Sequence, residues 1–91
     1  MKTLLENPLV AHMLQETEEI LNRMEAVHAA YLKEGKNGDA EIIGELIRTN
    51  ERLRDSIIGN DLEQAIHFCE HSHGILDRYP DLFDEIAEQG I

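Results

Sequence analysis

The chain has 91 residues, which is enough for one domain with a modest core, and 42% of them are apolar and 30% charged, as is typical of a folded protein. Nineteen acidic and eight basic residues give a formal net charge of -11, which repels nucleic acids and anionic membranes and favours cations or basic protein surfaces. One cysteine excludes an intrachain disulfide. No segment resembles a signal peptide or a membrane span, so we expect a cytoplasmic protein.

The first two helices are predicted from their capping and breaking residues. Asn7 followed by Pro8 is typical of a helix start, because asparagine caps the first turn and proline is tolerated at its first position. Nothing interrupts the helical pattern until Gly35. A turn follows, and Asp39 at its end can cap a second helix, which we expect over residues 40–58.

Two further helices complete the chain. Asp61 with Gln64 three residues later resembles a capping box and starts the third helix. This helix ends at Tyr79, because the residue before a proline disfavours helical geometry. A short last helix is predicted over residues 81–89. Tight turns make neighbouring helices antiparallel, so we expect one all-α domain over residues 1–91: an up-down-up antiparallel bundle of three long helices plus a short C-terminal helix.

Apolar residues in the three long helices recur at steps of three and four, which is the spacing of a buried stripe. The predicted stripes are, in helix order, Val10, Leu14, Thr17, Leu21, Met24, His28 and Tyr31; Ile43, Leu46, Ile47, Asn50, Leu53, Arg54 and Ile57; and Leu62, Ile66, Cys69, His73 and Leu76. The second stripe includes the polar residues Asn50 and Arg54. Buried polar side chains are costly unless they are paired, so we interpret these two as members of a buried polar network.

The first helix is longer than its partners and is expected to overhang them at its N-terminal end. Four apolar residues would then lack an intrachain lid: Leu9, Val10, Met13 and Leu14. An exposed apolar strip usually marks a contact surface, so we predict a homodimer with this strip inside the interface. The last helix carries a second apolar edge, formed by Leu82, Phe83 and Ile86, which is a candidate surface for binding a partner.

The segment HFCEHSH, residues 67–73, contains three of the five histidines and the only cysteine. Its first five residues read H-x-x-E-H, which resembles the zinc-binding motif of the inverzincin metalloproteases. That family needs a distant third ligand and a much larger fold, whereas only 20 residues follow His71. The phase of the third stripe also places His67 and His71 on the solvent face. We therefore predict two exposed surface histidines and no catalytic residues.

Two Glu-x-x-His pairs, Glu25 with His28 and Glu70 with His73, are expected at one height in the bundle. They resemble the ligand set of ferritin-like di-iron carboxylate proteins, in which each of two helices donates such a pair. The resemblance implies a transition-metal site, iron or zinc, held by these four residues. The arrangement departs from that family because the first and third helices run parallel and the bridging carboxylates have no clear source. The alternative is a buried polar network that joins these residues to the two polar residues of the second stripe.

The sequence favours a protein that is not an enzyme. No glycine-rich phosphate loop and no basic patch with aromatic residues is present. The expected function is that of a small acidic adaptor or regulator that binds another protein and is itself a homodimer. Two alternatives stay open. One is a small metal-binding bundle; the other is an acidic mimic of nucleic acid that blocks a basic site on another protein.

Overall fold

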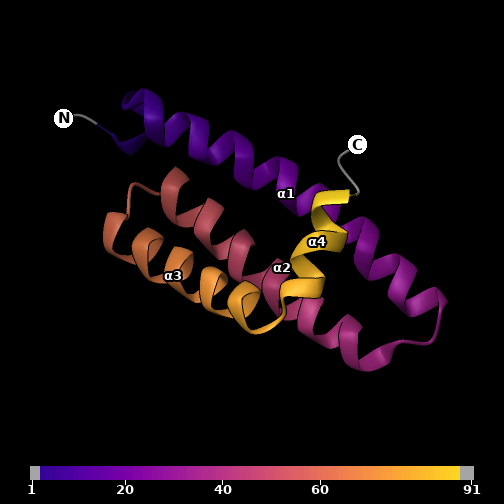
Figure 1. The fold of residues 1–91 in the computed structure, drawn as a ribbon. Coiled ribbons are helices and arrows are strands. Elements are labelled where there is room, and N and C mark those ends of the chain that lie inside the picture. Colours follow the sequence, from indigo (N-terminus) through magenta and orange to yellow (C-terminus); the bar gives the residue numbers. More distant parts are fainter. Residues whose placement is uncertain (1–2, 89–91) are drawn as a thin grey trace.

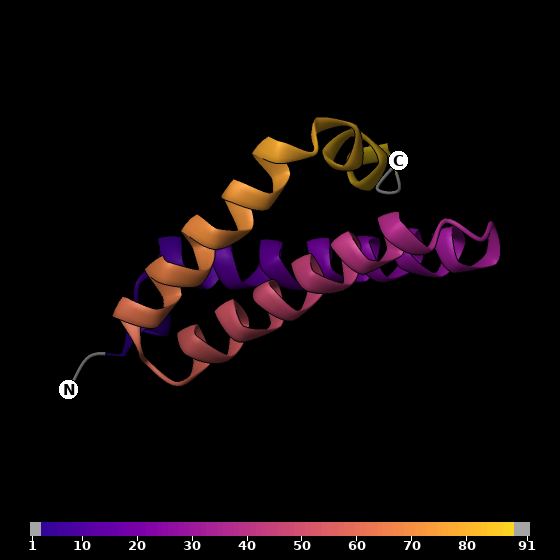
Figure 2. The same cartoon turned by 90° about the horizontal axis from the view of Figure 1, so that it is seen from below.

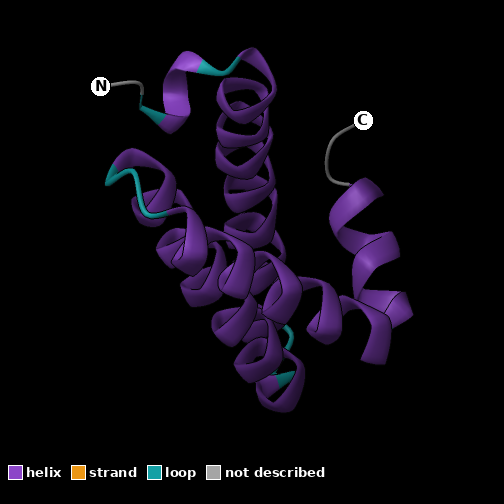
Figure 3. Ribbon diagram, turned by 90° about the vertical axis from the view of Figure 1, so that its left-hand side faces the viewer, coloured by secondary structure: helices purple, strands orange, loops and turns teal. Residues whose placement is uncertain are grey.

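The computed structural model describes residues 3–88, apart from the side chains of Phe83, Glu85 and Ala87. A short 3-10 turn, η1 (Leu4–Glu6), precedes four helices: α1 (Pro8–Lys33), α2 (Asn37–Ile58), α3 (Leu62–Arg78) and α4 (Pro80–Glu88). α1 packs antiparallel to α2, and α2 packs antiparallel to α3 (Figure 1). Short loops join the helices (Figure 3). The predicted all-α fold of three long antiparallel helices with a short C-terminal helix is confirmed.

Two of the predicted helix starts are capped by the expected side chains. Asn7 Oδ1 accepts a hydrogen bond from Leu9 N at 2.9 Å, and Asp61 Oδ1 accepts one from Gln64 N at 3.1 Å. Each bond satisfies a backbone donor that has no partner within the first helical turn. α2 differs, because it begins at Asn37, three residues before the predicted start, and its N-cap residue makes no capping bond through its side chain. The residues expected to form a turn therefore form the first turn of α2.

Asn60 joins the end of α2 to the N-terminal segment. Its backbone is left-handed, with φ of 61°, and the next residue, Asp61, donates its N–H to Ser56 O at 2.8 Å. This is the Schellman arrangement, which gives partners to the last carbonyls of a helix; Gly35, with φ of 78°, occupies the same position after α1. Asn60 Oδ1 also accepts a hydrogen bond from Leu4 N at 2.7 Å. The residue that ends α2 thus holds η1 against the α2–α3 turn.

The main core lies where α1, α2 and α4 meet, and α3 contributes little to it. Its buried residues are Leu21, Met24, Val27, Tyr31, Ala40, Ile43, Leu46, Ile75, Leu82 and Ile86, of which only Ile75 comes from α3. A smaller cluster, formed by Leu53, Ile57 and Ala65, lies near the α2–α3 turn. α3 rests on α2 and rises away from α1, and α4 turns back to pack on both α1 and α3 (Figure 2).

Candidate functional site

A groove runs between α1 and α3, with α2 as its floor. It encloses about 160 Å³. The side chains that line it include Met13, Glu16, Thr17 and Ile20 of α1, Asn50 and Leu53 of α2, and Cys69, Ser72, His73 and Leu76 of α3. The groove exists because α3 packs on α2 and α4 rather than along α1. Pockets for small molecules usually measure about 300–1,000 Å³, so this groove suits the side chains of a protein segment better than a small-molecule ligand.

Asn50 is the polar centre of the groove floor. It is 5% exposed, and its Nδ2 donates hydrogen bonds to Leu46 O at 2.9 Å and to Ser72 Oγ at 3.0 Å. Arg54 does not join this pair, since its Nε lies 3.3 Å from Asp55 Oδ1 at the surface. The structure therefore contains one buried polar pair here, Asn50 with Ser72, and Arg54 is not part of it. The predicted network of buried polar residues is wider than this pair.

α3 is rotated relative to its predicted stripe. Its buried residues are Ala65, Ser72 and Ile75, whereas Leu62 and Ile66 are 54% and 50% exposed. The predicted inward face of α3 is therefore wrong. The apolar spacing does not identify Ala65 and Ser72 as core residues, because one is small and the other is polar. Their small side chains nevertheless allow α3 to pack closely against α2. The apolar spacing predicts Leu62 and Ile66 as core residues, whereas the structure places both at the surface.

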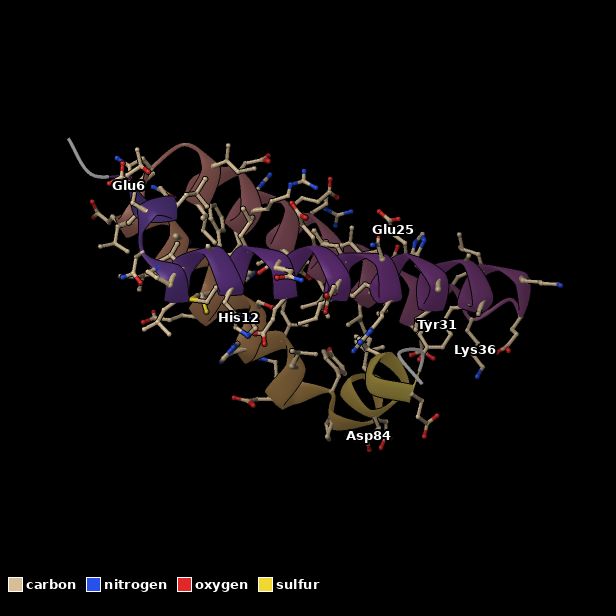
Figure 4. The ribbon with its side chains drawn as sticks, turned by 90° about the horizontal axis from the view of Figure 1, so that it is seen from above. Glu6, His12, Glu25, Tyr31, Lys36 and Asp84 are labelled. Carbon is tan, nitrogen blue, oxygen red and sulfur yellow. The ribbon has the colours of Figure 1, made fainter. Side chains whose placement is uncertain are left out.

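The four residues of the Glu-x-x-His pairs are not brought together. Glu25 is exposed on the edge of α1 that points away from α3 and α4 (Figure 4). His28 is half-buried, and its Nε2 would lie 3.8 Å from a Cβ placed on Gly44 of α2. Glu70 and His73 are both exposed on α3, and His73 lines the groove. Among the side chains that the structure describes, no group of three or more His, Cys, Asp or Glu is placed to hold a metal ion, so the ferritin-like interpretation has no support in the geometry.

The H-x-x-E-H motif lies on the outer side of α3. His67 and His71 are exposed, and together with Glu70 and Arg78 they line a shallow surface hollow. His71 Nε2 lies 3.5 Å from Glu45 Oε1 of α2, and both side chains are about half exposed. The motif therefore makes a surface contact between α3 and α2 in this structure.

The N-terminal strip of α1 is only partly exposed. Leu9 and Met13 are 75% and 42% exposed, but Val10 and Leu14 are half-buried against the cluster that contains Ile57. The predicted overhang is therefore corrected for Val10 and Leu14, which are covered by the C-terminal end of α2 and by α3. Leu9 and Met13 continue the groove-lining face of α1, just as Leu62 and Ile66 continue that of α3. We call these four residues the groove flanks.

α4 uses its apolar face inside the chain. Leu82 and Ile86 are each 6% exposed and belong to the main core. The prediction that they form an exposed binding edge is corrected, because α4 folds back onto α1 and α3 and buries them. The side chain of Phe83, the third member of that edge, lies outside the described residues.

Titratable side chains of α1 lie at the groove. His12 lies on the side of α1 that faces α3 and α4 (Figure 4), and its Nε2 is 2.9 Å from Glu16 Oε1. Glu16 lines the groove itself. A carboxylate beside apolar walls attracts a cationic group on a docking segment.

No known protein family, curated protein or solved structure matches this chain. Among the helices within residues 3–88, none has the length and apolar character needed to cross a membrane.

Proposed function

We propose that this protein is a non-enzymatic adaptor or regulator whose groove between α1 and α3 binds a segment of another protein. The observation that carries the proposal is the exposure of the four groove flanks: Leu9 75%, Met13 42%, Leu62 54% and Ile66 50%. Burying apolar surface contributes about 25 cal/mol of favourable free energy for each Å² removed from water. Apolar side chains gathered on one face beside a groove are typical of a protein-interaction surface.

The homodimer expected from the sequence would use the same surface, with a second copy of the chain as the partner. Two copies would bury their groove flanks against each other. Sedimentation velocity over a range of concentrations tests this form directly. A species of 10.4 kDa at every concentration would leave a different protein as the partner, whereas a species of twice that mass would support self-association.

The proposed surface is tested by affinity capture with matched variants. We expect proteins retained by the wild-type chain to be lost by the Met13→Glu/Ile66→Glu variant, because two carboxylates would replace two groove flanks. The control is Leu32→Glu, since Leu32 is similarly exposed, at 52%, at the far end of α1. Circular dichroism shows whether each variant keeps its helices. Equal retention by the groove variant and the control would contradict the proposal.

A further inference from the structure

The floor of the groove offers a hydrogen-bond acceptor to an incoming group. Asn50 is 5% exposed, and both of its hydrogen bonds use Nδ2 as the donor. Among the described residues, none donates a hydrogen bond to its Oδ1. Every fully buried side-chain nitrogen or oxygen in that part of the chain has a partner, so this oxygen must be accessible. The opening that Asn50 lines is the groove.

The two helices that form the walls of the groove are acidic. α1 and α3 together contain seven acidic and three basic residues, and α2, the floor, contains five acidic and three basic residues. A segment with a basic outer face is attracted by this charge. A second copy of a chain with net charge -11 is repelled by it.

The shape of the groove suits a helix. α1 and α3 are both antiparallel to α2, so they point in the same direction on either side of the groove, with α3 inclined to α1 (Figure 2). A helix laid between them would occupy the fourth position of a bundle, where its apolar face would contact Ile20, Leu76 and the groove flanks. The middle of that face would lie over Asn50.

Building on the proposed function, we infer that the partner segment is an amphipathic helix with a basic outer face and one hydrogen-bond donor, such as glutamine, at the centre of its apolar face. The donor pairs with Asn50 Oδ1. A single buried polar pair within an apolar seam fixes the register of one helix against another, because every other register leaves a polar group without a partner. Asn50 is thus a residue that determines specificity.

The test uses two synthetic helical peptides of about 18 residues, roughly 27 Å long. Both have leucine along one face and lysine elsewhere, and they differ at one central position of the apolar face, which is glutamine in one and leucine in the other. We expect the wild-type chain to bind the glutamine peptide about tenfold more tightly in a calorimetric titration, because the leucine peptide leaves Oδ1 buried without a donor. We expect the Asn50→Leu variant to lose this preference and Ser72→Ala, which keeps the oxygen, to retain it.

Several outcomes would overturn the inference. They are equal binding of the two peptides, a preference for the leucine peptide, no binding of either, or a preference that persists in Asn50→Leu. The wild-type comparison is decisive alone, even where Asn50→Leu fails to fold. A third peptide, with glutamate in place of lysine, is expected to bind at least tenfold more weakly in low salt. Equal affinity for the glutamate and lysine peptides would contradict the inference that the partner has a basic outer face.

The peptide result is separable from the proposed function. Capture that depends on Met13 and Ile66, together with a failed peptide comparison, would leave the groove as a binding site and overturn only the inferred partner. Self-association that the Met13→Glu/Ile66→Glu variant abolishes would identify a second copy as the occupant and would also overturn the inference. If the capture shows no dependence on the groove flanks, the proposed function itself falls.

Discussion

Asn50 Nδ2 donates a 3.0 Å hydrogen bond to Ser72 Oγ, which forms a buried polar link between α2 and α3. The two residues are 5% and 4% exposed. Because Nδ2 also bonds to Leu46 O, the amide keeps one partner when Ser72 is changed. We expect Ser72→Ala to lower the free energy of unfolding by about 1 kcal/mol, the net contribution of one such hydrogen bond. Urea denaturation followed by circular dichroism measures this change.

A double-mutant cycle isolates the same bond. The variants are Asn50→Leu, Ser72→Ala and the two combined. We expect the double variant to lose less stability than the sum of the single variants, by about 0.5–1.5 kcal/mol, because the bond can be lost only once. Strict additivity would show that the two side chains do not interact.

Asn60 is expected to stabilise the chain through both its backbone and its side chain. Asn60→Gly keeps the left-handed backbone and loses only the bond to Leu4 N, so we expect a loss of about 0.5–1.5 kcal/mol in the free energy of unfolding. Asn60→Ala loses the same bond and puts alanine in that conformation, which costs about 1–2 kcal/mol for an ordinary residue and less for asparagine or glycine. Thermal and urea unfolding of both variants should show alanine to be the more damaging. Equal losses would argue against backbone strain at this position.

The packing of α4 predicts a large difference between two leucines. Leu82 is 6% exposed and Leu9 is 75% exposed. We expect Leu82→Ala to cost about 2–5 kcal/mol, because it leaves a cavity in the core, and Leu9→Ala to change stability by less than about 0.5 kcal/mol. Urea unfolding of the two variants gives the comparison. A small effect at Leu82 would mean that α4 does not pack on α1 in solution.

The placement of the Glu-x-x-His residues leads to a prediction about metal content. We expect protein purified without chelator to contain no stoichiometric iron or zinc, because the four candidate ligands do not come together. Elemental analysis tests this expectation. A bound metal that is lost in the His28→Ala/His73→Ala variant and kept in the His67→Ala/His71→Ala variant would contradict the geometry.

Helix ends were predictable where a side chain makes the cap. Asn7 and the pair Asp61 with Gln64 act as local signals, and the structure places their capping bonds where the sequence indicates. The start of α2 was less predictable, since Asn37 and Gly38 are typical turn residues. Gly35 completes the turn after α1 at once, so these residues are free to begin the next helix.

The orientation of α3 required tertiary information. A stripe count gives weight to large apolar residues such as Leu62 and Ile66, whereas the face of α3 that packs on α2 is marked by Ala65 and Ser72. Asn50 and Ser72 are 22 residues apart in the sequence, so no local pattern predicts the hydrogen bond between them. The position of α4 depends in turn on the direction of α3. The groove could therefore not be predicted from the sequence, because its position depends on how the helices pack.

α4 has a consequence for how the groove can be controlled. It is joined to α3 directly after Tyr79, yet it buries Leu82 and Ile86 in the core beside α1. α4 packs on both α1 and α3, so the short C-terminal helix helps to set the spacing between the two walls. Any ligand, modification or fused domain that displaces α4 would therefore widen or narrow the groove from a distance and would change the affinity for a partner without touching the residues that bind it.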